Sequence, residues 1–248
     1  MSKRALAAAA RLRDPLERRV RGETLLEGPR LVAEALAAGV SLAQVFATDE
    51  DEFDRAAFEA AGAEVIEVGR AGLERVATTP HPKGPVAVMS IPPVSPATDG
   101  PSVVMAGLAD PGNLGTLIRS AAAFGWNVIC AGDGADPWSP KVMRAAAGGH
   151  FRSPPELLPE LDLPLLRVRG YTPAAAVVNG GLAPDQLPSH RWALLIGHEA
   201  RGLDPQWAEG ADFRVTIPMA SGSESLNAGV AGSLLMYAMA SGRPQPHH

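Results

Sequence analysis

The stretch VVMAGLADPGNLGTLIRSAAAFGWNVICA, residues 103–131, decides the fold that the sequence predicts. An apolar run leads through a Pro-Gly turn into a helical pattern from Leu114 to Phe124, which Gly125 ends. Trp126 to Ala131 is then a nearly continuous apolar strand. Because unbroken apolar strands are buried on both faces, this strand–helix–strand order favours an α/β fold with a largely parallel sheet.

Similar patterns extend to both sides of this stretch. A Pro-rich segment, residues 95–101, divides the chain into an N-terminal domain at 1–94 and a second domain at 102–248. The N-terminal domain reads as a small α/β unit, with helices at 27–38 and 54–61 and strands at 42–48, 64–68 and 85–91. The second domain adds helices at about 141–147 and 226–240, a short helix opened by Asp204-Pro205, and strands at 193–196 and near Val215.

Composition excludes several classes of protein. The chain has 248 residues, 46% of them hydrophobic, and no apolar run approaches the roughly 20 residues that cross a bilayer. Cys130 is the only cysteine, so an intrachain disulfide and a thiolate metal cluster are excluded. We expect a cytoplasmic protein without a metal site, in which Cys130 is a buried small hydrophobe.

Charge is distributed unevenly along the chain. The net charge is −5, which is not that of a strongly basic nucleic-acid binder. The first two dozen residues nevertheless gather seven cations against three acids; the cations are Lys3, Arg4, Arg11, Arg13, Arg18, Arg19 and Arg21. This N-terminal patch is either a phosphate-binding surface or an ordinary solvated helix face.

Three polar segments follow apolar runs and are the candidate functional segments. The first, 113–125, carries Asn113 and Arg119 off the apolar stripe of its helix, so both can project toward a common pocket. The second, 197–203, places Glu199 in a Gly-bounded turn. The third, 217–227, offers Ser225 and Asn227 before a helix. Taken singly, these residues read as helix caps, turn caps and surface charges. Together they predict one site at the carboxyl ends of the strands.

The three segments resemble, in order and spacing, motifs one, two and three of the SpoU/TrmH family of RNA ribose methyltransferases. This family belongs to the SPOUT superfamily, and the resemblance covers about Ser102 to Ala240. It implies a parallel sheet with a deep trefoil knot, which the sequence pattern alone would not predict because knots are rare. More weakly, residues 26–28 and 79–85 resemble the ribosomal-protein-like RNA-binding domain that precedes the catalytic domain in several members.

The resemblance also implies a cofactor, a substrate and roles for residues. S-adenosylmethionine is expected in the knot, held by Ile196, Gly197, Ile217, Met219 and Leu226. Arg119 is expected to grip the phosphate and alkoxide of an RNA ribose, with Glu199 orienting it and Asn113, Ser225 and Asn227 positioning ribose and donor. Lys141 and Arg144 are expected to contact RNA phosphates, although a solvated helix face explains them as well.

Several alternatives stay open at this point. We expect 2′-O-methylation of large-subunit ribosomal RNA, with transfer RNA as the nearest other substrate and a noncatalytic RNA-binding protein as the rival class. The family implies a homodimer with a composite active site, whereas the small and large residues of the last helix are also explained by packing within one subunit. Two departures from the family pattern, His198 and Gly229, affect the expected acceptor geometry.

Overall fold

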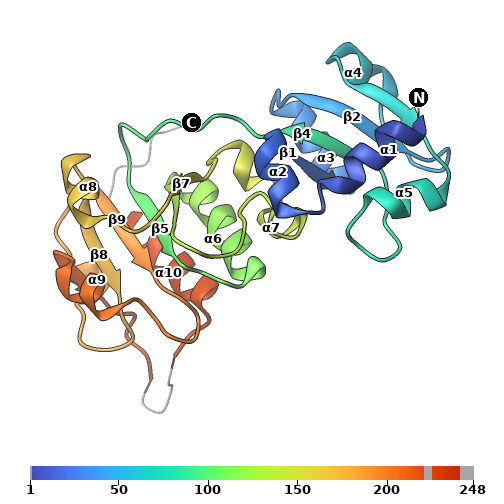
Figure 1. The fold of residues 1–248 in the computed structure, drawn as a ribbon. Helices are drawn as coiled ribbons and strands as arrows, with labels where there is room; N and C mark the ends of the chain where they lie inside the picture. Colours follow the sequence, from blue (N-terminus) through green and yellow to red (C-terminus); the bar gives the residue numbers. More distant parts are fainter. Residues whose placement is uncertain (1, 221–224, 241–248) are drawn as a thin grey trace. The chain divides into compact units, whose positions relative to one another are not determined.

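The computed structural model describes residues 2–220 and 225–240 of the chain, which divides into two compact units. Unit 1 combines the chain up to Pro93 with Trp138–Phe151, and unit 2 combines Val94–Pro137 with the chain from Arg152 onward (Figure 1). Each unit has its own sheet and its own hydrophobic core. The described part of the chain has no helix that is both long and apolar enough to cross a membrane.

Unit 1 is built on a four-stranded sheet in the order β1-β4-β2-β3. The central strand β4 runs antiparallel to both neighbours, and β2 and β3 are parallel. Side chains alternate across the sheet, so that each strand contributes to two cores. The strands are β1 (Glu23–Glu27), β2 (Leu42–Ala47), β3 (Glu64–Glu67) and β4 (Val86–Ser90).

Helices cover both faces of this sheet. One core packs Leu25 and Phe46 against α1 and α5, and the other packs Leu26 against α3, α4, Trp138 and Met143. Segment 138–151 therefore completes the second core of unit 1. The helices are α1 (Ser2–Arg11), α2 (Pro15–Arg21), α3 (Pro29–Ala37), α4 (Arg55–Ala60), α5 (Arg70–Val76) and α7 (Pro140–Ala146), with a 3-10 turn η1 (Gly149–Phe151).

The start of unit 1 differs in detail from the sequence prediction. The basic N-terminal helix is broken into two, because Asp14 caps α2 and Pro15 occupies its first turn. The helix predicted from Glu27 begins at Pro29, since residues 23–27 form β1 beside β4. Edge strand β1 was missed because its pattern, Glu-Thr-Leu-Leu-Glu, is short and lacks alternation.

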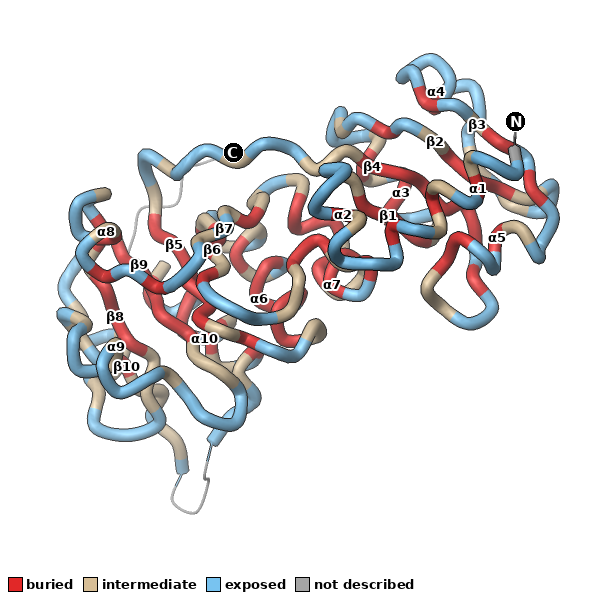
Figure 2. Tube along the Cα trace, viewed as in Figure 1, coloured by how far each residue is buried: buried red, intermediate tan, exposed pale blue. Residues whose placement is uncertain are grey.

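Unit 2 contains a six-stranded sheet in which every pairing is parallel, in the order β10-β8-β9-β5-β6-β7. This confirms the α/β fold with a parallel sheet. Central strands β5 and β9 are buried along their whole length, as their unbroken apolar sequences predict (Figure 2). The strands are β5 (Ser102–Ala106), β6 (Asn127–Ala131), β7 (Glu156–Leu158), β8 (Thr172–Ala176), β9 (Trp192–Ile196) and β10 (Phe213–Val215).

Two pairs of helices sandwich the sheet of unit 2. Helices α6 (Pro111–Phe124) and α10 (Ala228–Ala240) lie side by side on one face (Figure 1), where Ser120 and Ser233 share a hydrogen bond of 2.7 Å. On the other face, a core that includes Val104 and Leu195 packs against α8 (Leu163–Val168) and α9 (Pro205–Gly210). A short 3-10 turn, η2 (Pro184–Gln186), precedes β9.

The division into units differs from the predicted domains in one respect. The sequence prediction placed all of 102–248 in one domain, whereas the structure packs residues 138–151 into unit 1. The predicted linker is fastened to unit 2, because Arg191 donates to the carbonyls of Ala97 and Gly100 at 2.9 Å each. That the chain forms the trefoil knot of the SPOUT superfamily stays a prediction.

Candidate active site

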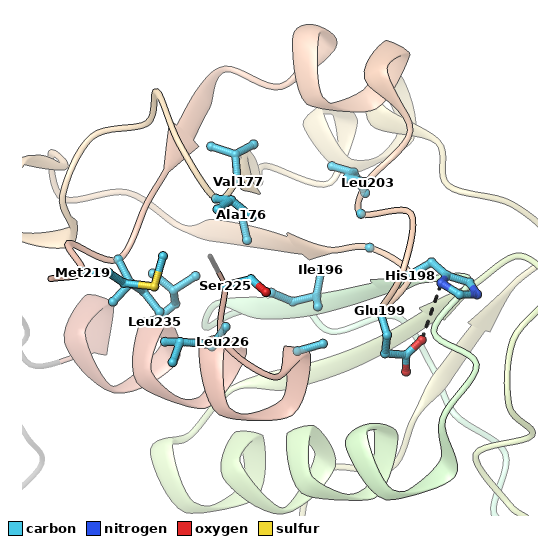
Figure 3. A pocket seen from close by; sticks show the side chains of 16 residues that line it. Ala176, Val177, Ile196, His198, Glu199, Leu203, Met219, Ser225, Leu226 and Leu235 are labelled. Carbon is cyan, nitrogen blue, oxygen red and sulfur yellow. Dashed lines mark ion pairs between the residues drawn. The ribbon is translucent and has the colours of Figure 1, made fainter. Parts of the chain in front are cut away.

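A pocket of about 150 Å³ opens in unit 2 beside the carboxyl ends of β8 and β9 (Figure 3). All five residues predicted to hold the cofactor line this pocket; they are Ile196, Gly197, Ile217, Met219 and Leu226. Glu199 and Ser225, from the second and third polar segments, line it too. The remaining wall is mainly apolar and comes from Ala176, Val177, Val178, His198, Gly202, Leu203, Ala228, Ala231 and Leu235.

The turn that follows β9, residues 197–203, forms one side of the pocket. The amide of His198 donates to the carbonyl of Gly202 at 3.0 Å, and the amide of Gly202 donates back at 2.7 Å. The turn folds so closely over Gly197 that a Cβ there would lie 2.2 Å from the nitrogen of Leu203. Only glycine fits at this position, since the obstructing atoms belong to the backbone.

Glu199 joins this turn to the start of α6. Its carboxylate accepts hydrogen bonds from the amides of Ala109 (3.2 Å) and Asp110 (2.9 Å), and from Nδ2 of Asn113 (3.2 Å). Partial burial raises the pKa of Glu199, but the hydrogen bonds from its own amide, Asp110, Asn113 and Ala109 outweigh burial and lower the pKa below its ordinary value. The carboxylate is therefore ionised and fixed at the edge of the pocket.

Asn113 continues the network to the third polar segment. Its Oδ1 accepts a hydrogen bond of 2.8 Å from Nδ2 of Asn227, whose own Oδ1 accepts from the amide of Val230 in the first turn of α10. Asp110 caps α6 by accepting from the amide of Asn113 at 2.8 Å. Asn113 is thus a bridge between two helix starts, and the three polar segments converge as the sequence predicted.

Gly229 permits this convergence. A Cβ at this position would lie 3.3 Å from Cα of Asn113 and 3.2 Å from Oδ1 of Asn227, which is tighter than usual packing. The departure from the family pattern at residue 229 therefore coincides with close packing of α10 on the start of α6.

Arg119 does not join this cluster. It lies exposed on α6, it is absent from the pocket lining, and it makes no hydrogen bond or ion pair with any residue that the structure describes. Six positions along a helix also turn Arg119 away from Asn113 by about a third of a revolution. Within one chain Glu199 does not contact Arg119, because its carboxylate binds the start of α6. That Glu199 orients Arg119 stays a prediction.

The other predicted site residues are distributed as follows. Ser225 is exposed at the pocket edge, and its neighbours Ser221, Gly222, Ser223 and Glu224 lie outside the described residues. Lys141 is exposed on α7 in unit 1. Arg144, predicted to contact RNA, instead donates from Nη1 to the Glu27 carboxylate and to Oγ1 of Thr78, both at 2.9 Å. Its guanidinium is thus engaged inside unit 1.

Cys130 lies on β6, outside the pocket lining, and is half-buried rather than buried as predicted. Burial, with a contribution from the charge of Asp136, raises the pKa of the Cys130 thiol to about 12, so it stays protonated at neutral pH. Within residues 2–220 and 225–240, no cluster of three or more His, Cys, Asp or Glu side chains is arranged to hold a metal ion.

Comparison with known protein families matches profiles to both units of the chain. A family profile described as SpoU rRNA Methylase matches residues 100–237, which include all three polar segments. The chain belongs to the SpoU rRNA Methylase family. A second profile, described as an MRM3-like substrate binding domain, matches residues 5–87 of unit 1. The family predicted from the sequence is therefore confirmed.

Relatives of this SpoU family member share both units. The 23S rRNA (guanosine(2553)-2′-O)-methyltransferase RlmP of Bacillus subtilis is 31% identical over 220 residues, which cover 86% of each chain. The SpoU methyltransferase AviRb of Streptomyces viridochromogenes, solved with S-adenosylmethionine, is 25% identical, with a TM-score of 0.82 over 96% of this chain and 97% of that one. A solved RNA 2′-O ribose methyltransferase is 28% identical, with a TM-score of 0.77 over 95% and 94%.

Sequence reasoning missed part of the pocket of this SpoU family member. Strand β8, which ends at Ala176, and the two pocket residues after it, Val177 and Val178, were not identified. A signal existed, since Gly170 precedes the apolar run and Asn179-Gly180-Gly181 follows it as a turn. The alanines and Pro173 in β8 weakened that signal, because strands are rich in β-branched and aromatic residues.

Proposed function

We propose that this protein transfers the methyl group of S-adenosylmethionine to a ribose 2′-hydroxyl of large-subunit ribosomal RNA. One observation carries the proposal: the five residues predicted to bind the cofactor line a single pocket, beside which Glu199, Asn113 and Asn227 form one hydrogen-bonded chain. Membership of the SpoU family and the 2′-O-methyltransferase activity for which the relative RlmP is named support the same reaction.

The pocket suits the cofactor by its surface chemistry. The walls are mostly apolar, as a planar heteroaromatic ring requires, and polar groups converge at one end. In the described chain, the amides of Ile217, Met219 and Leu226 make no hydrogen bond to other backbone groups, so they are available to a ligand. When bound, S-adenosylmethionine supplies an electrophilic methyl group on a sulfonium centre.

The chain's own residues must position the ribose and assist loss of its 2′ proton, because a ribose hydroxyl is a weak acid. We assign the phosphate and alkoxide grip to Arg119, whose planar fork is free of partners among the described residues and suits bidentate binding. Glu199, Asn113 and Asn227 act as positioning residues that hold the pocket edge together. Ser225, exposed at that edge, completes the ribose side.

A homodimer explains how Arg119 reaches the reaction from outside its own pocket. Helix α10 exposes Val230, Leu234 and Tyr237 on one side, with between 46% and 59% of their surfaces accessible, which is unusual for large apolar residues three and four positions apart. Pairing of this face with a second copy would form the composite site that the family implies, with Arg119 of one copy beside the pocket of the other.

Ribosomal RNA is a better candidate substrate than transfer RNA. The similarity to RlmP extends over both units, and a substrate-binding profile matches unit 1. By contrast, a solved structure that concerns 2-OH methylation of C/U34 on tRNA aligns with only 59% of this chain, at a TM-score of 0.52. With a ribosomal RNA substrate, we propose that the protein acts in the cytoplasm.

A methyl-transfer assay tests the proposal. Purified protein is incubated with tritiated S-adenosylmethionine and either ribosomal RNA or transfer RNA lacking the modification, and the labelled nucleotide is mapped. Label on a ribose 2′-oxygen of large-subunit ribosomal RNA is expected. Label confined to transfer RNA would reassign the substrate, and cofactor binding without transfer to either RNA would favour a noncatalytic role.

Arg119→Lys tests the central assignment. The substitution keeps the charge and loses the fork, so we expect methyl transfer to fall by at least about 100-fold, with little change in cofactor affinity. Arg214→Lys, an exposed arginine of β10 outside the pocket lining, is the matched control. Retention of most activity by Arg119→Lys would remove Arg119 from the reaction.

A further inference from the structure

His198 is a pocket-lining residue to which neither the sequence motifs nor the reaction assigns a role. It follows β9 directly, and its backbone closes the 198–202 turn through two hydrogen bonds to Gly202. Its side chain adds a third bond, since Nδ1 accepts from the amide of Ala200 at 3.0 Å. A single residue therefore makes all three of the hydrogen bonds that close this wall of the pocket.

The hydrogen bond from Ala200 depends on the protonation state of the imidazole. A ring nitrogen accepts a hydrogen bond only when it carries no proton, so this bond requires a neutral ring with its hydrogen on Nε2. An acceptor that binds an amide two residues later is the arrangement that asparagine uses in Asx turns. Unlike asparagine, histidine changes its charge within the physiological pH range.

A proton on Nδ1 would turn this acceptor into a donor that faces another donor. The ring would then lose its hydrogen bond from the Ala200 amide. It would gain an ion pair with Glu199, whose Oε2 lies 3.8 Å from Nδ1 (Figure 3). Glu199 holds the start of α6 at the same edge of the pocket. Among the described residues, the other charged groups at this edge are Arg201 on the turn and Asp110 before α6. Helix α10, which lines the pocket too, carries no charged residue.

We propose that His198 is a positioning residue whose neutral imidazole holds the 197–203 turn against the cofactor pocket, so that the pocket loses affinity for S-adenosylmethionine when this ring is protonated. The inference rests on the proposed function, because it takes the pocket to be the cofactor site. It adds that this enzyme's cofactor affinity falls in mild acid through one identified side chain.

Calorimetric titration of the full chain with S-adenosylmethionine at pH 7.5 and pH 5.5 tests the proposal. We expect wild-type affinity to fall about fivefold at the lower pH, the size of one net hydrogen bond. His198→Asn keeps an acceptor without a titrating group, so its affinity should change by less than about twofold. His198→Ala lacks the acceptor, so it should bind about fivefold more weakly than the wild type already at pH 7.5.

Matched controls separate this effect from other titrations. His81→Asn replaces an exposed histidine of unit 1, at a positive φ of 51° that asparagine also tolerates. Its affinity for S-adenosylmethionine should change between the two pH values by the same factor as that of the wild type. Ionisation of the ligand itself affects all variants equally. Circular dichroism at both pH values reports whether each variant is folded, and long-range ¹⁵N correlation spectra should show His198 with a bare Nδ1 at pH 7.5.

The outcomes are distinguishable. Parallel pH dependence in the wild type and His198→Asn, or a protonated Nδ1 at pH 7.5, would overturn the role of His198 while leaving cofactor binding intact. Absence of binding by the folded wild type at both pH values would overturn the proposed function, and this inference with it.

Discussion

Two carboxylates, Glu27 in unit 1 and Glu199 in unit 2, each gather several hydrogen-bond donors, yet they serve different ends. The Glu27 side chain is 4% exposed and binds the amide and hydroxyl of Thr78, the hydroxyl of Thr79 and the Arg144 guanidinium. Glu199 binds backbone amides and Asn113 beside an open pocket, with its side chain 23% exposed. The first network joins parts of a core, and the second joins the edges of a site.

The difference lies in the neighbours rather than in the carboxylates. Glu27 is neutralised by a cation and surrounded by protein, so its loss is expected to cost stability. Glu199 has no arginine or lysine partner in the described chain, and its contacts fix a turn that lines a pocket, so its loss is expected to cost function. Substitutions in both units test this contrast.

The largest effect is expected from Gly197→Ala. The added Cβ would lie between 2.2 and 2.4 Å from backbone atoms of Gly202 and Leu203, so the turn must move and the pocket lose its shape. We expect cofactor binding to become undetectable by calorimetry. Gly69→Ala in unit 1 is the control, because its φ is −70° and no atom lies within 4 Å of the added Cβ. Binding by Gly197→Ala at wild-type affinity would contradict this account of the turn.

Glu27→Ala should mainly destabilise unit 1. It removes three hydrogen bonds from Thr78 and Thr79 and the ion pair with Arg144, at a cost of about 3 kcal/mol in the free energy of unfolding. Urea denaturation measures this cost, with Trp138, the one tryptophan of unit 1, as the local fluorescence probe once the other three are replaced by phenylalanine. Glu67→Ala, which breaks an exposed pair with Arg55, should cost less than about 1 kcal/mol. A large loss of cofactor affinity in folded Glu27→Ala would contradict the interpretation that Glu27 contributes to stability rather than to function.

Glu199→Gln should reverse this pattern. The amide presents a donor to groups that themselves donate, so at least one of the bonds to Ala109, Asp110 and Asn113 is lost. We expect kcat/KM for methyl transfer to fall about tenfold, because a hydrogen bond to a charged group contributes about 1.4 kcal/mol. The free energy of unfolding should change by less than this amount. Glu209→Gln, an exposed residue of α9, is the control. Unaltered kinetics would demote Glu199 to a turn cap.

The smallest effect is a pH dependence of stability. Hydrogen bonds lower the pKa of Glu199 in the folded protein below its ordinary value of 4.5. The ionised carboxylate therefore stabilises the fold at pH values above this ordinary pKa. That stabilisation is lost as the pH falls through the lowered pKa. The difference in melting temperature between the wild type and Glu199→Gln should therefore shrink between pH 6 and pH 3. A difference that grows in acid would contradict the direction of the shift.

The sequence predicted those features that depend on local pattern. The apolar runs at 103–105, 126–131 and 193–196 are strands of one parallel sheet. Asn113 and Glu199, which follow the first and the third of these runs, meet because parallel strands end at the same edge. The residues predicted to bind the cofactor were inferred from the resemblance of the motifs, and all five line one pocket.

What the sequence did not predict depends on contacts between distant residues. Trp138 and Met143 are as apolar as any residue of unit 2, and nothing local shows that they pack against Leu26. Arg144 was predicted to bind RNA because its partner Glu27 lies 117 positions away. In the same way, the choice of Glu199 between Arg119 and the amides before α6 is set by the fold of the turn.

The course of the chain between the units has a consequence for how the protein is made. Unit 1 needs Trp138 and Met143 to complete one of its cores, yet β5, α6 and β6 of unit 2 are synthesised before them. On the ribosome, residues up to Pro93 therefore emerge with an apolar face still uncovered, and the two units mature in overlapping intervals rather than one after the other. A fragment that ends at the Pro-rich segment would keep that face exposed permanently.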